Sequence, residues 1–198
     1  HILCPARDYK RIFDADQGPN TGGMGAVATR ELVDAEMLAR IEREIVRPTV
    51  EGLGKDGLPY RGFIYFGLML TPHGPKVVEY NCRFGDPECE AVMPLLGGDF
   101  VQYVWHGARG ELRPDLISFA DGWSVCVILA SAGYPASSRS GDVISGLEQV
   151  ENARVYHCGT RQNASGAFET NGGRVLAIVA QGATREEALA TVNAQAEK

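Results

Sequence analysis

The sequence has no long hydrophobic run and no leader-like start. No stretch approaches the roughly 20 consecutive apolar residues that a membrane-spanning helix requires. The first residues show no basic segment followed by an apolar one, which is the pattern of a secretory signal peptide. We therefore expect a soluble protein with no membrane partner.

Paired cysteines and clustered histidines are also missing. The chain has five cysteines, none in C-x-x-C spacing, and its four histidines are isolated from one another. An odd number of cysteines cannot all pair within one chain, and zinc sites are built from clustered Cys and His ligands. The pattern predicts reduced thiols, a cytoplasmic location and no zinc.

Positive charge is scarce overall. The chain has 19 Lys and Arg against 25 Asp and Glu, a formal net charge of −6. Proteins that coat nucleic acid or bind anionic membranes need clustered basic surface, so we expect neither partner. A local basic pocket for a phosphorylated small molecule is still compatible with this charge.

What is present is an ordinary globular composition, with 44% hydrophobic and 22% charged residues in 198. That length allows one large domain or two small ones. The type of secondary structure that the residues predict changes near residue 120. We therefore predict an α+β domain over residues 1–120 and a mostly β domain over residues 121–198. The chain begins at His1 rather than at methionine, which suggests a piece of a longer protein.

Local patterns predict the elements of the first domain. They are a helix that is capped by Asp34 and bends or ends at Pro48, strands at residues 63–70 and 76–81 joined by a turn, a helix with Asp86 as its cap and Pro87 at its first position, and a helix over residues 99–106.

In the second domain, strands are predicted at residues 125–129, 155–157 and 174–180. Asn171-Gly172 indicates a hairpin, because both residue types tolerate positive φ. Thr184 and Glu187 have the spacing of a capping box, which predicts a final helix.

The common nucleotide-binding glycine motifs are absent. Gly18 and Gly23 have the spacing of a P-loop, but Met24 stands where that motif requires lysine, and no G-x-G-x-x-G occurs. Most glycine-rich loops are simply turns. The alternative is that exposed backbone N–H groups of residues 18–25 form an anion-binding nest, with Asp8 and Lys10 supplying charge nearby.

Residues 77–88 carry the most chemistry. A β-branched run leads into Glu79, Asn81 and Arg83, and alternate residues of a strand share one face. A carboxylate and an amide oxygen can bind Mg²⁺, and a guanidinium beside them can bind phosphate. The alternative is a row of polar side chains on a half-exposed strand.

Three motifs, taken together and in this order, resemble the phosphoribosylamine–glycine ligase family: residues 6–11, residues 18–26 and residues 79–88. Residues 133–135, 141–146 and 170–176 extend the resemblance over nearly the whole chain. The family belongs to the ATP-grasp ligases. The resemblance implies an α+β fold, namely the C-terminal lobe of an ATP-grasp domain, mostly antiparallel sheet with helices, followed by a small mainly-β domain.

The resemblance also implies an activity. Such enzymes use ATP to phosphorylate glycine, and 5-phosphoribosylamine then displaces phosphate from glycyl phosphate to give glycinamide ribonucleotide in purine biosynthesis. Mg²⁺ or Mn²⁺ is the expected cofactor and ATP the co-substrate. The small-molecule substrates would be the partners of a monomer, and the N-terminal and nucleotide-covering domains would lie outside this chain.

Carried over residue by residue, the resemblance assigns the following roles. Glu79 and Asn81 would be metal ligands, Arg83 and Asp86 catalytic residues, Met69 a nucleotide contact, and Asp8, Lys10, Asn20, Thr21, Gly22, Gly23, Met24 and Gly25 substrate- or phosphate-binding residues. We expect the 198 residues alone to be inactive. The alternatives are a non-catalytic ATP-grasp-like module, or an ATP-grasp carboxylase or ligase that acts on another acid.

Overall fold

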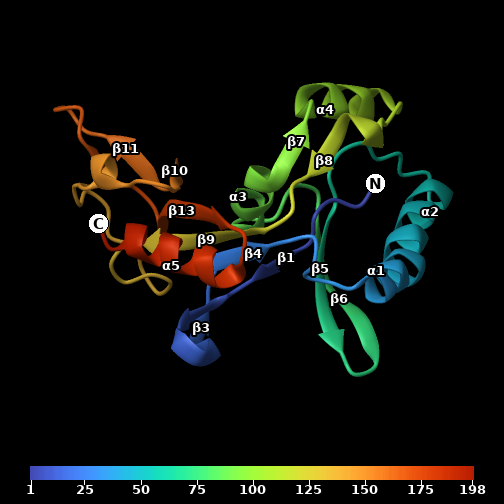
Figure 1. The fold of residues 1–198 in the computed structure, drawn as a ribbon, viewed down its shortest axis with the longest axis horizontal. Helices are drawn as coiled ribbons and strands as arrows, with labels where there is room; N and C mark the ends of the chain where they lie inside the picture. The colour runs from blue at the N-terminus through green and yellow to red at the C-terminus, as the bar shows by residue number, and fades with distance from the viewer. The chain divides into compact units, whose positions relative to one another are not determined.

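The chain divides into two units, each of which gathers segments from distant parts of the sequence. In the computed structural model, which describes residues 1–198, unit 1 comprises His1–Leu3, Glu31–Gly85 and Leu96–Phe119. Unit 2 comprises Cys4–Arg30, Asp86–Leu95 and Ala120–Lys198. Figure 1 shows the elements of both units with the labels used below.

Unit 2 is built on a five-stranded antiparallel sheet with strand order β1-β4-β9-β13-β10. Its strands are β1 (Ala6–Asp8), β4 (Gly25–Ala28), β9 (Trp123–Ala130), β10 (Arg154–His157) and β13 (Arg174–Gly182). Strands β9 and β13 are apolar along nearly their whole length because both of their faces are covered.

One helix packs on each face of the five-stranded sheet. Helix α5 (Arg185–Ala196) packs on β9 and β13, where Val192 and Ala188 meet Val125 and Ile178 (Figure 1). Alternate strand residues such as Cys126 face the other way, toward the side that α3 (Glu88–Val92) contacts. The hydrophobic core of unit 2 is therefore a sheet between two helices.

Unit 2 also has short elements around this sheet. They are the strand pair β2 (Arg11–Phe13) and β3 (Gln17–Asn20), the pair β11 (Thr160–Gln162) and β12 (Phe168–Thr170), and the 3₁₀ turns η1 (Asp14–Asp16), η3 (Met93–Leu95) and η5 (Leu147–Gln149).

Unit 1 contains a long helical segment, one β-hairpin and one strand pair whose strands are separated by a helix. The helical segment runs through α1 (Ala35–Ile41), the π-helical η2 (Glu42–Val46) and α2 (Arg47–Lys55). The other elements are the pair β5 (Tyr65–Thr71) and β6 (Gly74–Asn81), the pair β7 (Leu96–Gly98) and β8 (Ile117–Phe119), helix α4 (Phe100–Arg109) and the 3₁₀ turn η4 (Pro114–Leu116).

Several helix starts match the sequence predictions. The Asp34 carboxylate accepts the Met37 N–H at 2.7 Å, and the Asp99 carboxylate accepts the Gln102 N–H at 2.9 Å. Both bonds of the Thr184–Glu187 capping box are present. The predicted caps at Asp34 and Thr184 and the predicted helix from Asp99 are confirmed, because a cap is a contact between residues only two or three positions apart.

Of the two outcomes predicted at Pro48, a bend or an end of the helix, the end does not occur: the helix continues to Lys55, and a π-helical turn stands directly before α2. Two other local predictions are wrong. Asn171-Gly172 does not close a hairpin, because β12 pairs with β11 while β13 pairs with β9 and β10.

The other wrong prediction concerns Asp86. Helix α3 begins at Glu88 with Pro87 as its N-cap residue, and no side chain caps it. The Asp86 carboxylate instead forms an ion pair with Arg174 at 2.9 Å. A long-range partner thus replaced the local one that the sequence suggested.

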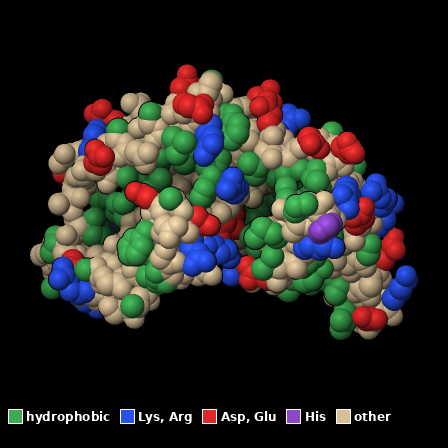
Figure 2. All heavy atoms as spheres, turned by 90° about the horizontal axis from the view of Figure 1, so that it is seen from below, with side chains coloured by type: hydrophobic (Ala, Val, Ile, Leu, Met, Phe, Trp, Pro, Cys, Tyr) green, Lys and Arg blue, Asp and Glu red, His purple; other side chains and the backbone are tan.

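All five cysteines are free, as predicted. Every helix is too short or too polar to cross a lipid bilayer. On the face drawn in Figure 2, basic and acidic side chains are interspersed, with hydrophobic side chains between them.

Candidate functional site

Glu79 and Asn81 lie on the same face of strand β6. In the antiparallel ladder with β5, Glu79 stands opposite Gly67 and Asn81 stands opposite Tyr65. The register is regular between these two pairs, so both polar side chains leave the sheet on one side. Glu79 is exposed and Asn81 is half-buried, so a ligand in solution can reach both.

Arg83 does not continue this row. Strand β6 ends at Asn81, and Cys82 and Arg83 lie in a bend, so strand alternation no longer governs the direction of their side chains. The Arg83 side chain is exposed and donates a hydrogen bond to the Phe84 carbonyl at 2.8 Å. Strand alternation therefore supports a shared face for Glu79 and Asn81 but not for Arg83.

Gly67 makes room for Glu79. A Cβ at position 67 would stand 2.8 Å from the Glu79 Cγ, so the Glu79 side chain lies directly over this glycine. No second carboxylate can stand opposite Glu79 on the preceding strand. Any metal held here would take its remaining ligands from water or from a bound phosphate.

Met69 and Lys76 occupy the next pair of the same face. A bulge between Gly67 and Leu68 leaves Val78 without a partner, so Lys76, three positions before Glu79, is the residue that stands opposite Met69. The Met69 side chain is 59% exposed, which is high for an apolar residue. This face therefore combines a carboxylate, an amide, a cation and an open apolar side chain.

The donor set of β6 fits a hard divalent cation. Mg²⁺ is typically held by one or two carboxylates together with waters and substrate phosphates. Glu79 and Asn81 supply two oxygen ligands from rigid strand positions. No group of three or more His, Cys, Asp or Glu side chains forms a self-contained metal cage in this structure.

In unit 2, Asp8 lies at the end of β1 with its side chain only 9% exposed. Its Oδ2 is 3.5 Å from the Lys10 Nζ, and its Oδ1 is buried without a hydrogen-bond partner. Burial, and secondly the nearby carboxylate of Glu88, raise the pKa of Asp8 to about 6, while Lys10 opposes the shift.

Gly23 packs between Asp8 and Pro87. A Cβ at this position would stand 2.5 Å from the Pro87 Cδ and 2.9 Å from the Asp8 Oδ1, and its φ is +119°. Only glycine combines that backbone conformation with that clearance. The glycine-rich loop is thus in direct contact with two other predicted segments of the site.

The N–H groups of this loop are already hydrogen-bonded within the chain. Thr21 N–H donates to the Lys10 carbonyl (2.8 Å), Gly22 N–H to the Tyr134 hydroxyl (2.9 Å), Gly23 N–H to the Thr21 hydroxyl (3.0 Å), and Met24 N–H to the Tyr9 carbonyl (2.8 Å). The alternative in which exposed N–H groups form an anion-binding nest is therefore not supported for residues 21–24. Asn20 ends β3 opposite Arg11, and Gly25 opens β4 against β9.

Sequence reasoning missed Arg174 and Tyr134 as parts of this region. Both lie in segments that carry the family resemblance, but neither side chain is a predicted site residue. The Arg174 guanidinium pairs with Asp86, and Tyr134 receives the Gly22 N–H. Since these partners are distant in sequence, no local spacing could have indicated the contacts.

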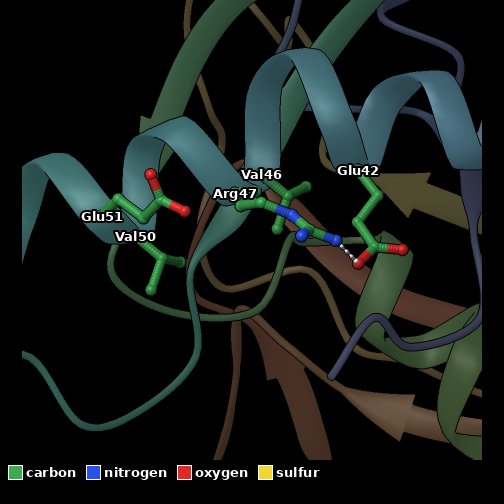
Figure 3. A pocket seen from close by; sticks show the side chains of 5 residues that line it. All are labelled: Glu42, Val46, Arg47, Val50 and Glu51. Carbon is green, nitrogen blue, oxygen red and sulfur yellow. Dashed lines mark hydrogen bonds and ion pairs between the residues drawn. The ribbon is translucent and has the colours of Figure 1, made fainter.

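Two surface hollows of the structure do not contain the candidate site residues. One, of about 300 Å³, is lined by Glu42, Val46, Arg47, Val50 and Glu51, all from a single helical stretch of unit 1 (Figure 3). Arg47 and Glu42 form an ion pair across it at 3.2 Å. One helix alone cannot enclose a ligand, so this hollow is not a candidate site.

Comparison with known families settles the relationship. The model of the phosphoribosylglycinamide synthetase ATP-grasp (A) domain matches residues 1–89, and the model of the phosphoribosylglycinamide synthetase C domain matches residues 124–198. The chain belongs to the phosphoribosylglycinamide synthetase family. The family resemblance found in the sequence is confirmed.

Curated members of this family are close in sequence. The chain is 46% identical over 186 residues to the phosphoribosylamine–glycine ligase of Caldanaerobacter subterraneus subsp. tengcongensis, covering 94% of this chain and 44% of that protein. It is 42% identical over 189 residues to that of Yersinia pestis, with the same shares covered. The chain thus spans less than half the length of these relatives.

Solved structures agree on the fold. The crystal structure of phosphoribosylamine–glycine ligase from Thermotoga maritima matches with a TM-score of 0.86 and 39% identity, covering 98% of this chain and 47% of that one. A biotin carboxylase from Campylobacter jejuni matches with a TM-score of 0.58 and 15% identity, covering 88% and 38%. The ATP-grasp fold expected from the sequence is confirmed.

Proposed function

We propose that this chain is part of a ligase that joins glycine to 5-phosphoribosylamine at the expense of ATP, through glycyl phosphate, in purine biosynthesis. The observation that supports this most is the match to both domains of one ligase family over most of the chain. The relatives named above carry that activity in their names. A monomeric state and a cytoplasmic location stay predictions.

Glu79 and Asn81 are the proposed ligands for Mg²⁺ or Mn²⁺. Two oxygen donors on one strand face, with Gly67 opposite, leave positions for phosphate oxygens and water. A divalent ion there would offset negative charge on the phosphates of ATP. The exposed Met69 on the same face is the proposed nucleotide contact.

Arg83 and Asp86 follow directly after this strand. We propose that the exposed Arg83 guanidinium stabilises charge on the transferred phosphoryl group. Asp86, held by Arg174, would orient an amine or hydroxyl of the substrate through its carboxylate, which is 51% exposed. Asp8, Lys10 and the loop of residues 20–25 would position glycine and the ribose phosphate.

The test is made in the full-length protein. Replacing Glu79 by Gln should raise the Mg²⁺ concentration needed for half-maximal activity and lower kcat by about a hundredfold or more, because one anionic metal ligand is lost. ADP release is followed with glycine and phosphoribosylamine present, over a Mg²⁺ series. Glu51→Gln, an exposed carboxylate on α2, is the matched control.

Equal Mg²⁺ dependence in the two variants would refute the metal assignment. ADP release by the unaltered protein that needs neither glycine nor phosphoribosylamine would refute the proposed reaction. In that case the fold shared with biotin carboxylase makes a different acid the next substrate class to test.

A further inference from the structure

Arg174, the first residue of β13, makes four contacts with two distant segments through one nitrogen. Its Nη1 donates to the carbonyl oxygens of Gly22 (3.1 Å), Gly23 (3.4 Å) and Asp86 (2.9 Å), and lies 2.9 Å from the Asp86 Oδ1. The side chain is only 21% exposed. All these residues belong to unit 2.

Tyr134 contacts the same loop from a second position. Its hydroxyl accepts the Gly22 N–H at 2.9 Å. Its ring lies against Gly173, where an added Cβ would stand 2.5 Å from the Tyr134 Cδ2. Gly22 is itself tightly enclosed, since a Cβ there would be 3.2 Å from the Arg174 Cζ and 3.3 Å from the Tyr134 hydroxyl oxygen.

The two contacts are complementary. Tyr134 accepts from the Gly22 N–H, while Arg174 donates to the Gly22 carbonyl, so the peptide groups on both sides of this residue are held. Glycine has more backbone freedom than any other residue, and consecutive glycines order poorly without outside contacts. Thr21, Gly23 and Met24 are also bonded through Lys10, Tyr9 and Thr21 itself, but both peptide groups of Gly22 are held by side chains from residues 124–198, the part matched by the C domain.

We propose that Arg174 and Tyr134 are positioning residues for the substrate loop and for Asp86. Together they fix Gly22 and Gly23 and hold the Asp86 carboxylate in one orientation. The inference rests on the proposed function, in which the loop and Asp86 contact glycine and phosphoribosylamine. Residues matched by the C domain thereby position a loop that belongs to the part matched by the ATP-grasp (A) domain.

Loss of the Arg174 contacts should raise the KM of one group of substrates and leave the KM of ATP nearly unchanged. In the full-length protein, Arg174→Met should raise the KM for glycine or phosphoribosylamine about tenfold or more, because hydrogen bonds to a charged group contribute on that order. The KM for ATP should change less than about twofold, since a loss confined to one subsite leaves binding at the other intact. Arg174→Lys keeps the charge but not the planar, multi-donor group, and should restore activity only in part.

Tyr134→Phe removes a single oxygen and keeps the ring against Gly173. It should raise the same KM in the same direction as Arg174→Met, by a smaller factor. Arg139→Met is the matched control, because Arg139 also pairs with an aspartate, Asp142, at 2.7 Å but is 68% exposed and contacts no site segment.

Amide hydrogen exchange in the full-length variants provides a readout that does not require turnover. The Gly22 amide should exchange at least about tenfold faster in Tyr134→Phe than in Arg139→Met, because its acceptor is gone. Kinetics of Arg174→Met that equal those of Arg139→Met would overturn the proposal. So would an equal rise in the KM for ATP, or full restoration by lysine.

If the proposed function itself is wrong, the assay of the unaltered protein gives a different result. The unaltered protein would then show no ADP release that depends on glycine and phosphoribosylamine, whatever the variants do. Unchanged exchange of the Gly22 amide in both Arg174→Met and Tyr134→Phe would by itself refute the positioning role.

Discussion

Asp8 is a carboxylic acid held where water hardly reaches it. Burial and the neighbouring Glu88 raise its pKa to about 6, well above the usual value of 3.8. An acid whose pKa is higher in the folded state binds more protons when folded, over the range between the two values. The stability that Asp8 contributes is therefore complete below about pH 4 and is lost as pH rises through about 6.

Asp8→Asn removes this titration. Relative to the variant, the unaltered protein should lose roughly 2 kcal/mol of unfolding free energy between pH 4 and pH 7, by the linkage of a pKa difference to stability. Urea unfolding at a series of pH values measures it. Asp121→Asn, whose side chain is 93% exposed, should track the unaltered protein. A parallel pH profile for Asp8→Asn would show that Asp8 titrates normally.

Among the elements, some helix N-termini are fixed by contacts between residues close in sequence, and others are preceded by residues whose contacts are distant in sequence. Asp34, Asp99 and Thr184 cap their helices within three residues of themselves, and all three start sites could be inferred from the sequence. Asp86 precedes α3 but pairs with Arg174, which no local pattern indicates.

The capping box of α5 offers a stability test. Thr184→Ala removes the acceptor for the Glu187 N–H and should lower the unfolding free energy by about 1 kcal/mol. Thr184→Ser keeps the hydroxyl and should lower the unfolding free energy by only a few tenths of a kcal/mol, because serine is also a preferred N-cap residue. Thermal or urea unfolding of both variants checks the difference. Equal losses would assign the effect to the threonine methyl group rather than to the cap.

For the whole molecule, the candidate residues lie in both units. The metal pair is on β6 in unit 1, and the loop, Asp8 and Asp86 are in unit 2. The relatives that share both domains are more than twice as long as this chain. The family resemblance implies that the lobe covering the nucleotide lies outside these residues.

Residues 1–198 on their own should therefore release ADP no faster than the enzyme-free control, with ATP, Mg²⁺, glycine and phosphoribosylamine present. The full-length protein should do so readily in the same assay. Circular dichroism of the 198-residue protein controls for folding. Glycine-dependent ADP release by the isolated, folded residues would mean that they contain a complete catalytic site.

The family, the α+β character, the pairing of β5 with β6 and the shared face of Glu79 and Asn81 could all be predicted from the residues alone. Each of these depends on order along the chain or on strand alternation, which are local properties. The same reasoning failed for Arg83, because alternation stops where the strand ends, and no composition rule marks that residue.

The side chains that hold the substrate loop could be identified only from the folded structure. Arg174 reaches Gly22 across 152 positions and Asp86 across 88, and Tyr134 reaches Gly22 across 112. It also showed that the loop's N–H groups are already paired and that Asp8 is buried. These facts follow from how β1, β4, β9 and β13 pack side by side in one sheet, and packing between distant segments leaves no periodic trace in the sequence.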